Sequence, residues 1–457
     1  MPARLLAATP RLSLHLALLT TLAVSACSSS GDDGYDGRLD APAGVYANPA
    51  ITATDTGWTA VENAARYIVT ARASGQADVS TSVTAPATGV RVSGLQADTD
   101  YSLTVQAVDA DGDVSESSSA VTVHTPRLIN TAAERDAYNA AADYSDTIGG
   151  HAVVVVRDGQ IVFERYSNGH RRAQSHVLAS GTKSFSCAFM LAAEQDGYLT
   201  RDQNVSSVLT EWQSDPNKSR MTVRQLLSLQ GGLSTNPDYS PIDVAEQDTY
   251  QLALDDPANF APGSAFIYDP LAFQAFALMF ERRSGGTDPV AYLQDKVFEP
   301  IGLSGDEWQR DANDKPQMAG GASMTAEAWA RYGQMMLQGG SWQTQRILPA
   351  DGVDDCLHYR NEAYLGYGIT WWLNRPVEGS YDPSVDQIPV DGQPVDGYVA
   401  PGAPEDMVMA AGVGHQRLYL LPSQRLVVVR FAALETETDS WSDGEFLSRL
   451  LGSASGG

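Results

Sequence analysis

The chain has 457 residues, with 30 basic and 56 acidic side chains and a formal net charge of -26. At roughly 100–200 residues per domain, this length predicts two or three domains. A hydrophobic fraction of 43% is sufficient for packed cores and excludes a mainly disordered chain. The acidic balance argues against nucleic-acid binding, which requires a cationic surface. Three cysteines are too few for a scaffold built from disulfides.

Residues 1–26 have the form of a secretory signal peptide, in which two arginines precede an apolar stretch and small residues follow it. The segment ends at Cys27 in a pattern that resembles the lipobox of bacterial lipoproteins. This resemblance implies cleavage before Cys27 and a lipid on its sulfur, and Ser28 in the next position implies the outer membrane. We therefore expect a lipid-anchored protein of the bacterial cell envelope, with ordinary secretion as the alternative. Cleavage removes two arginines and no acid, which gives a mature charge of -28.

Residues 27–40 are rich in Ser, Gly and Asp and predict a flexible tether. Residues 41–126 then predict an all-β, Ig-like sandwich, because short runs of β-forming residues alternate with turn clusters. This part resembles a fibronectin type III domain, and the residues that carry the resemblance are Trp58, Tyr67, Leu95 and Tyr101. Such a domain is expected to act as a spacer or to contact a glycan or a protein.

Residues 127–457 predict a second domain of α+β class. A helix is expected over 131–147, and Asp158-Gly159 between two apolar runs indicates a β-hairpin. A second hairpin is expected over 416–431, followed by a short helix over 446–451. Strands at both ends with helices between them predict an antiparallel sheet with a helical insert.

Ser180 and Lys183 are the main candidates for chemistry. Residues three apart lie on one face of a helix, so the hydroxyl would be within reach of the amine. The apolar stretch over 185–193 predicts that this helix is buried. A buried lysine loses its proton more easily and can then activate a serine as a nucleophile. The alternative is a surface helix that begins with Ser180 as its N-cap.

Over 131–455 the chain resembles the serine β-lactamase and penicillin-binding protein family, in its class C-like branch of esterases and carboxypeptidases. The matching segments are Ser180–Phe185, Met221–Leu233, Tyr268 before a helix, and Ala410–Gln416. The resemblance implies a β-lactamase/transpeptidase-like fold and an acyl-enzyme on Ser180. It also implies proton transfer by Lys183 and Tyr268, and an oxyanion hole made by the backbone N–H groups of Ser180 and Gln416. No cofactor or metal is expected, since the seven histidines are scattered.

Two segments depart from the family pattern, and both are expected to line the substrate cleft. The usual Tyr-x-Asn is Tyr268-Asp269-Pro270 here, and the usual Lys-Thr-Gly is Val413-Gly414-His415. The cleft candidates are Asp269, Val413, Gly414 and His415. Because proline has no amide and valine cannot bind a carboxylate, the departures favour a carboxylic ester or a small amide as substrate. The alternatives are a D-Ala carboxypeptidase or weak β-lactamase, and a non-catalytic envelope binding protein.

Cys187 and Cys356 are the remaining cysteines. An exported protein could pair them. Since Cys187 falls within the apolar helical stretch, we expect a buried free thiol.

Overall fold

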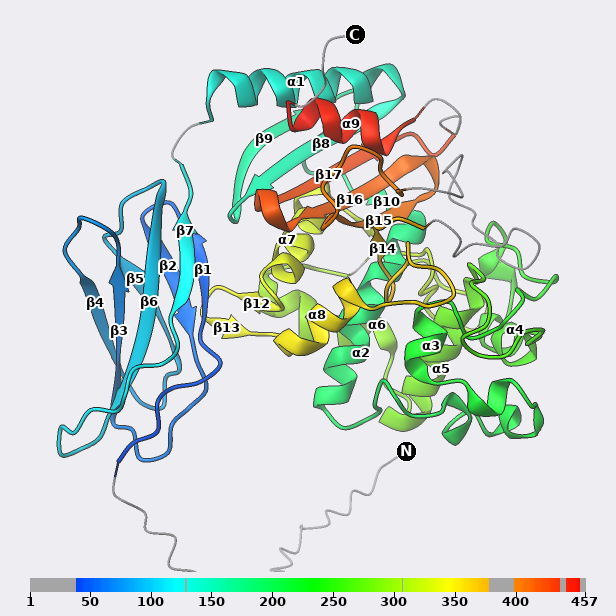
Figure 1. Ribbon diagram of the computed structural model, residues 1–457. Helices are drawn as coiled ribbons and strands as arrows, with labels where there is room; N and C mark the ends of the chain where they lie inside the picture. Colours follow the sequence, from blue (N-terminus) through cyan, green and yellow to red (C-terminus); the bar gives the residue numbers. More distant parts are fainter. Residues whose placement is uncertain (1–37, 128–129, 306, 378–397, 436–440, 453–457) are drawn as a thin grey trace, which may run out of the picture. The chain divides into compact units, whose positions relative to one another are not determined.

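The computed structural model describes residues 38–127, 130–305, 307–377, 398–435 and 441–452 (Figure 1). The signal segment, Cys27 and most of the tether lie outside these residues, so the expectations for them remain predictions. Within the described ranges, no helix combines the length and the apolar character needed to cross a bilayer.

The N-terminal domain is the predicted sandwich of two antiparallel sheets, one with the strand order β1-β2-β5 and the other β4-β3-β6-β7. Its strands are β1 (Tyr46–Ala50), β2 (Ala53–Gly57), β3 (Arg66–Arg72), β4 (Val79–Thr84), β5 (Gly89–Ser93), β6 (Thr99–Val108) and β7 (Val121–Thr125). The four residues that carried the resemblance, Trp58, Tyr67, Leu95 and Tyr101, are all buried in its core. The Tyr101 hydroxyl accepts a hydrogen bond from the Gln96 N–H at 2.9 Å, a corner contact that ties β6 to the preceding loop.

The second domain is built on a six-stranded antiparallel sheet with the order β14-β15-β16-β17-β8-β9. Its strands are β8 (Gly150–Arg157), β9 (Gln160–Tyr166), β14 (Trp372–Leu373), β15 (Val408–Gly412), β16 (Gln416–Leu421) and β17 (Leu426–Ala432). Two-stranded pairs are formed by β10 (His176–Val177) with β11 (Ser323–Met324), and by β12 (Ser341–Trp342) with β13 (Gln345–Arg346). Strand β17 pairs with β8, so strands from the two ends of the domain lie side by side in one sheet. This agrees with the antiparallel sheet predicted from the two hairpins.

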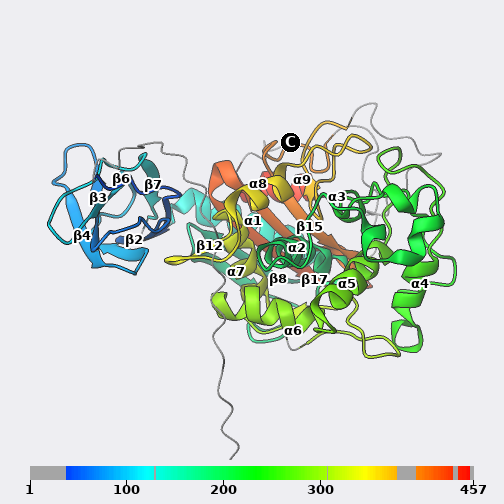
Figure 2. The same cartoon turned by 90° about the horizontal axis from the view of Figure 1, so that it is seen from below.

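Helices cover both faces of this sheet. Figure 1 shows α1 (Ala132–Thr147) and α9 (Asp443–Leu450) over one face and α7 (Ala326–Leu337) over the other, and α7 contacts β8 and β17. The remaining α-helices are α2 (Phe185–Gln195), α3 (Val223–Leu227), α4 (Thr249–Asp255), α5 (Leu271–Ser284), α6 (Pro289–Leu293) and α8 (Ala350–His358). Helix α2 is buried over Phe185–Ala193 and contacts α6 and α8 (Figure 2).

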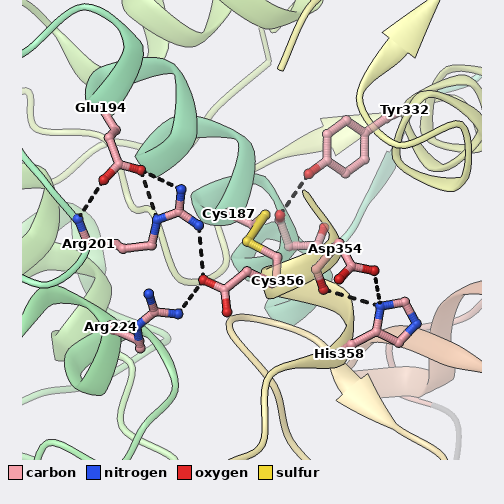
Figure 3. The surroundings of a disulfide bond; sticks show 10 residues. Cys187, Glu194, Arg201, Arg224, Tyr332, Asp354, Cys356 and His358 are labelled. Atoms are coloured by element: carbon pink, nitrogen blue, oxygen red, sulfur yellow. Dashed lines mark hydrogen bonds and ion pairs between the residues drawn. A yellow bond between two sulfur atoms is a disulfide. The ribbon is translucent and has the colours of Figure 1, made fainter. Parts of the chain in front are cut away.

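The expectation of a free thiol at Cys187 is wrong. Cys187 on α2 forms a disulfide with Cys356 on α8, with a sequence separation of 169 and 6.3 Å between their Cα atoms (Figure 3). The apolar surroundings of Cys187 were predicted correctly, but they are the interior of a packed helix pair in which the partner cysteine is also fully buried. The interior position of Cys187 was therefore no argument against pairing.

Candidate active site

The predicted nucleophile lies at the start of the buried helix. Residues Ala179–Ser184 form a 3₁₀ helix that leads directly into α2. Side chains three apart eclipse each other in a 3₁₀ helix, and the Lys183 Nζ accordingly donates to the Ser180 Oγ at 2.8 Å. Ala179, the residue before the serine, has a left-handed φ of 47°, a strained conformation of a kind that clusters at functional sites.

Lys183 is buried, with 3% of its surface exposed. Its Nζ also donates to the Ala319 carbonyl at 2.9 Å and lies 4.8 Å from the ring centroid of Tyr268. Burial lowers the pKa of Lys183 to about 7, and the opposing effect of Asp269 is smaller. A substantial fraction of the amine is therefore neutral near pH 7 and can accept the proton of Ser180.

Tyr268 lies three residues before the first residue of α5 and completes the triad of polar groups. Its ring stacks on Trp372, with 5.6 Å between ring centroids. Burial raises the pKa of Tyr268 to about 12, although a hydrogen bond with Ser180 and the charge of Arg417 act in the opposite direction. The phenol of the free protein is thus a proton donor at neutral pH, and the cations near it do not outweigh burial.

These three side chains open into a cavity of about 850 Å³. Its lining residues are Val177, Ala179, Ser180, Lys183, Thr235, Tyr239, Pro241, Ile242, Tyr268, Pro270, Gln309, Gln317, Ala319, Gly320, Ala411, Gly412, Val413, Arg417 and Leu434. The volume is typical of a site for a small organic molecule. Among the sequence-predicted residues, the cavity brings together Ser180, Lys183, Tyr268 and Val413.

The other cleft candidates do not line this cavity. Asp269 is 1% exposed, and its Oδ1 accepts hydrogen bonds from the Leu271 N–H at 3.0 Å and the Thr235 hydroxyl at 3.2 Å. His415 is also 1% exposed, and its ring stacks 6.0 Å from Trp441.

Gln416 does not line the cavity either. Its side-chain amide braces the turn after β15: the Nε2 donates to the carbonyls of Val413 at 3.2 Å and Gly414 at 3.0 Å, and the Oε1 accepts from the Ala432 N–H at 3.0 Å. The residue of this turn that reaches the cavity is Val413, which is 57% exposed.

The end of β15 packs closely against the nucleophile segment. A Cβ added to Gly412 would lie 2.1 Å from the Leu178 carbonyl oxygen and 3.2 Å from the Gly181 nitrogen. Only glycine allows this approach. The strand end therefore places the backbone that follows Gly412 beside the Ser180 segment.

Exposed apolar side chains surround the cavity, and sequence reasoning missed most of them. Of six large hydrophobic residues that are exposed in the described part of the chain, four line it: Val177, Ile242, Val413 and Leu434. Ile242 is 86% exposed. Exposed apolar patches of this kind are typical of binding surfaces. Ile242 and Leu434 belong to loops far from Ser180 in sequence, and no motif marks them.

Arg417 is a charged side chain in the cavity wall, but it is already paired. Its Nε donates to the Asp443 carboxylate at 2.9 Å, and both side chains are almost fully buried. Asp443 also accepts a hydrogen bond from the Trp441 indole at 3.0 Å. In the described ranges, no group of three or more His, Cys, Asp or Glu side chains has an arrangement that could hold a metal ion.

Comparisons with known proteins place this geometry in a family. Residues 132–451 match the Beta-lactamase family and residues 40–124 match the fibronectin type III domain. A curated relative, lovastatin esterase of Penicillium rubens, is 27% identical over 158 residues, which is 28% of this chain and 38% of that protein. The match thus spans well under half of the relative's length.

Solved structures share the fold. The hydrolase EstCE1, described as having promiscuous acyltransferase activity, superposes with a TM-score of 0.54 at 15% identity and covers 71% of this chain and 100% of its own. A family VIII carboxylesterase superposes with a TM-score of 0.53 at 17% identity and covers 72% of this chain and 98% of its own. The family match alone extends over most of the chain, and the protein therefore belongs to the beta-lactamase family of serine hydrolases, with a fibronectin type III domain before the hydrolase domain.

Proposed function

We propose that this protein hydrolyses carboxylic esters or small amides with apolar groups, through an acyl-enzyme on Ser180. The observation that carries the proposal is the 2.8 Å hydrogen bond between the Lys183 Nζ and the Ser180 Oγ at the base of an apolar-rimmed cavity. A neutral lysine beside a serine is an activated nucleophile.

In the proposed reaction, the neutral amine of Lys183 takes the proton of Ser180 as its Oγ attacks the substrate carbonyl carbon. The tetrahedral intermediate collapses when Tyr268 donates its proton to the leaving oxygen or nitrogen. Water then attacks the acyl-enzyme by the reverse roles and releases the acid and free Ser180.

The oxyanion of the intermediate needs two backbone N–H donors. One is the N–H of Ser180, as expected from the sequence. For the second we propose Val413 in place of Gln416, because Val413 lines the cavity and follows Gly412, which packs on the Ser180 segment.

The apolar rim supports an uncharged substrate. β-Lactams and D-Ala termini carry a carboxylate, which requires an available cation, whereas Arg417 in the cavity wall is neutralised by Asp443. The lovastatin esterase and the family VIII carboxylesterase are esterases by name. We therefore place ester hydrolysis ahead of carboxypeptidase or β-lactamase activity.

The test compares turnover of a short-chain nitrophenyl ester with that of a chromogenic cephalosporin, and labels the protein with a fluorophosphonate. We expect ester turnover to dominate and the label to attach to Ser180. Ser180→Ala should abolish both with the fold retained. The control Ser186→Ala should retain both, because the Ser186 hydroxyl is buried on α2 and has no hydrogen-bond partner in the described part of the chain. If cephalosporin turnover dominates, β-lactamase activity ranks ahead of ester hydrolysis. If Ser180 remains unlabelled, a non-catalytic binding protein is favoured.

We further propose that the protein is exported and anchored through a lipid on Cys27. The lipobox-like segment supports this, and so does the Cys187–Cys356 disulfide, since such bonds persist in oxidising compartments. Metabolic labelling with palmitate should mark the wild-type protein and not Cys27→Ala. Equal labelling of both proteins would contradict the assignment of Cys27.

A further inference from the structure

Two buried carboxyl groups lie behind the candidate catalytic lysine. Asp269 directly follows Tyr268 and is 1% exposed, and Asp256 follows the last residue of α4 and is fully buried. The two side chains contact each other, and the charges of Asp269 and Lys183 interact. Buried acids of this kind are rare unless they are paired, so their contact requires an explanation.

Several carboxyl oxygens of the two acids lack a hydrogen-bond donor among the described residues. The Asp269 Oδ1 accepts from Leu271 and Thr235. The Asn236 N–H lies near the Asp256 carboxyl, but among the described residues no well-aligned donor reaches either oxygen of Asp256 or the Asp269 Oδ2. Two carboxylates in contact cannot both be ionised in a buried site, and a proton between them supplies the missing donor. Burial and the neighbouring acid raise the pKa of Asp256 to about 10, and burial also raises that of Asp269. The pair therefore retains one proton at neutral pH.

A lysine lies at each end of the pair. The charge of Lys183 interacts with Asp269, and that of Lys218 with Asp256. Lys218 is 7% exposed and donates its Nζ to the Leu254 carbonyl at 2.9 Å. The other titratable groups around these four are Tyr268 beside Lys183, Tyr239 near Asp269, and Asp215 and Asp255 near Lys218. One negative charge is thus held between two buried amines.

We propose that Asp269 and Asp256 act as positioning residues for Lys183, by sharing one proton and holding a single negative charge behind its amine. This inference rests on the proposed role of Lys183 as a base. Two ionised carboxylates would hold the lysine as an ammonium, which cannot accept a proton. A neutral pair would remove the negative charge of Asp269, which among the described residues opposes the effect of burial on the Lys183 pKa, and would weaken the amine as a base.

The pair also accounts for one departure from the family pattern. The usual Asn is replaced by Pro270, which has no side chain to hold the lysine. Asp269, one position earlier, does not line the cavity, and its charge acts on Lys183 instead. An electrostatic influence on the lysine is thus retained, without a direct ion pair between these two described residues.

The test is the pH dependence of ester hydrolysis by the full chain, with three variants. Asp269→Asn removes the charge nearest Lys183, and we expect the acidic limb of the pH–rate profile to move down by about one pH unit. Asp256→Asn can donate its amide to Asp269 and leaves that carboxylate ionised, so its limb should stay in place or move up. Asp158→Asn is the matched control. Asp158 lies in the β8–β9 turn, is 3% exposed and pairs with Arg425, so the acidic limb of this variant should stay in place.

An unshifted limb in Asp269→Asn would overturn the proposal, and so would a downward shift in Asp256→Asn. Circular dichroism confirms that each variant is folded. If Asp269→Asn does not fold, Thr235→Val removes a hydrogen bond to Asp269 and should move the limb down by a smaller amount; an unshifted limb would then refute the inference.

A second readout separates this inference from the proposed function. The rate at which a fluorophosphonate labels Ser180 also depends on the neutral amine of Lys183, and it needs no substrate. If the wild-type protein is labelled but hydrolyses no ester, the proposed substrate class fails while the labelling profiles of Asp269→Asn and Asp256→Asn still test the acid pair.

Discussion

Removal of the Cys187–Cys356 disulfide should lower the free energy of unfolding of the hydrolase domain by up to about 5 kcal/mol. The bond closes a loop across 169 residues. The chain-entropy relation for a loop of this length gives about 5 kcal/mol at 25 °C, most of it from the greater freedom of the reduced unfolded chain. The perturbation is the double variant Cys187→Ala, Cys356→Ala.

The folded domain should keep the contact between α2 and α8 without the bond. Arg201 donates to Glu194 at the end of α2 and to Asp355 on α8, both at 2.9 Å, and Arg224 also contacts Asp355 (Figure 3). These ion pairs are mostly buried and lie beside the disulfide. The loss should therefore arise in the unfolded state, and ester hydrolysis at 25 °C should persist.

The assay is urea unfolding followed by tryptophan fluorescence, which reports mainly on the hydrolase domain because Trp58 alone of the eight tryptophans lies in the sandwich. The double variant should unfold at lower urea than the wild type. Reductant should shift the wild-type midpoint toward that of the variant and leave the variant unchanged. A double variant within about 1 kcal/mol of the wild type, with no effect of reductant on either, would refute the loop-entropy reasoning.

Three further outcomes are expected. Gly412→Ala should lower kcat at least about tenfold, because its Cβ would lie 2.1 Å from the Leu178 carbonyl oxygen and displace the nucleophile segment; unchanged steady-state kinetics would contradict this. Tyr101→Phe should cost the sandwich about 1–2 kcal/mol, measured by thermal unfolding, since the Gln96 N–H loses its acceptor. The wild-type kcat/KM should fall about tenfold per pH unit below about pH 7, where Lys183 becomes protonated; a flat profile from pH 5 to 8 would exclude this base.

The sequence contains enough local information to predict the sheet and the central pair of the site. Asp158 and Gly159 adopt φ angles of 49° and 78°, as a two-residue hairpin turn requires. Ser180 and Lys183 are three residues apart, so their contact depends only on local helical geometry. These features are determined within a few residues, which is why pattern reasoning identifies them.

The features that were missed depend on contacts between distant segments. Nothing near Cys187 indicates that α8 brings a second sulfur to it. The burial of Asp269 beside Asp256 and Thr235 joins segments that are distant in sequence. The apolar rim likewise depends on where the loops of Ile242 and Leu434 lie in space. The resemblance implies Gln416 as the second oxyanion donor, whereas we propose Val413, because Val413 lines the cavity and the Gln416 side chain braces the turn.

The closure of the sheet by β17 and β8 has a consequence for the order of folding during synthesis. Leu426 pairs with Arg157 and Val429 with Val154, so β8 gains this neighbour only after some 270 further residues have been translated. At about 5–20 residues per second, the nascent chain waits many seconds with that strand edge open. The sandwich, by contrast, is complete once β7 has left the ribosome. Ribosome-bound chains that stop before Leu426 should therefore contain a folded sandwich and a protease-sensitive hydrolase segment.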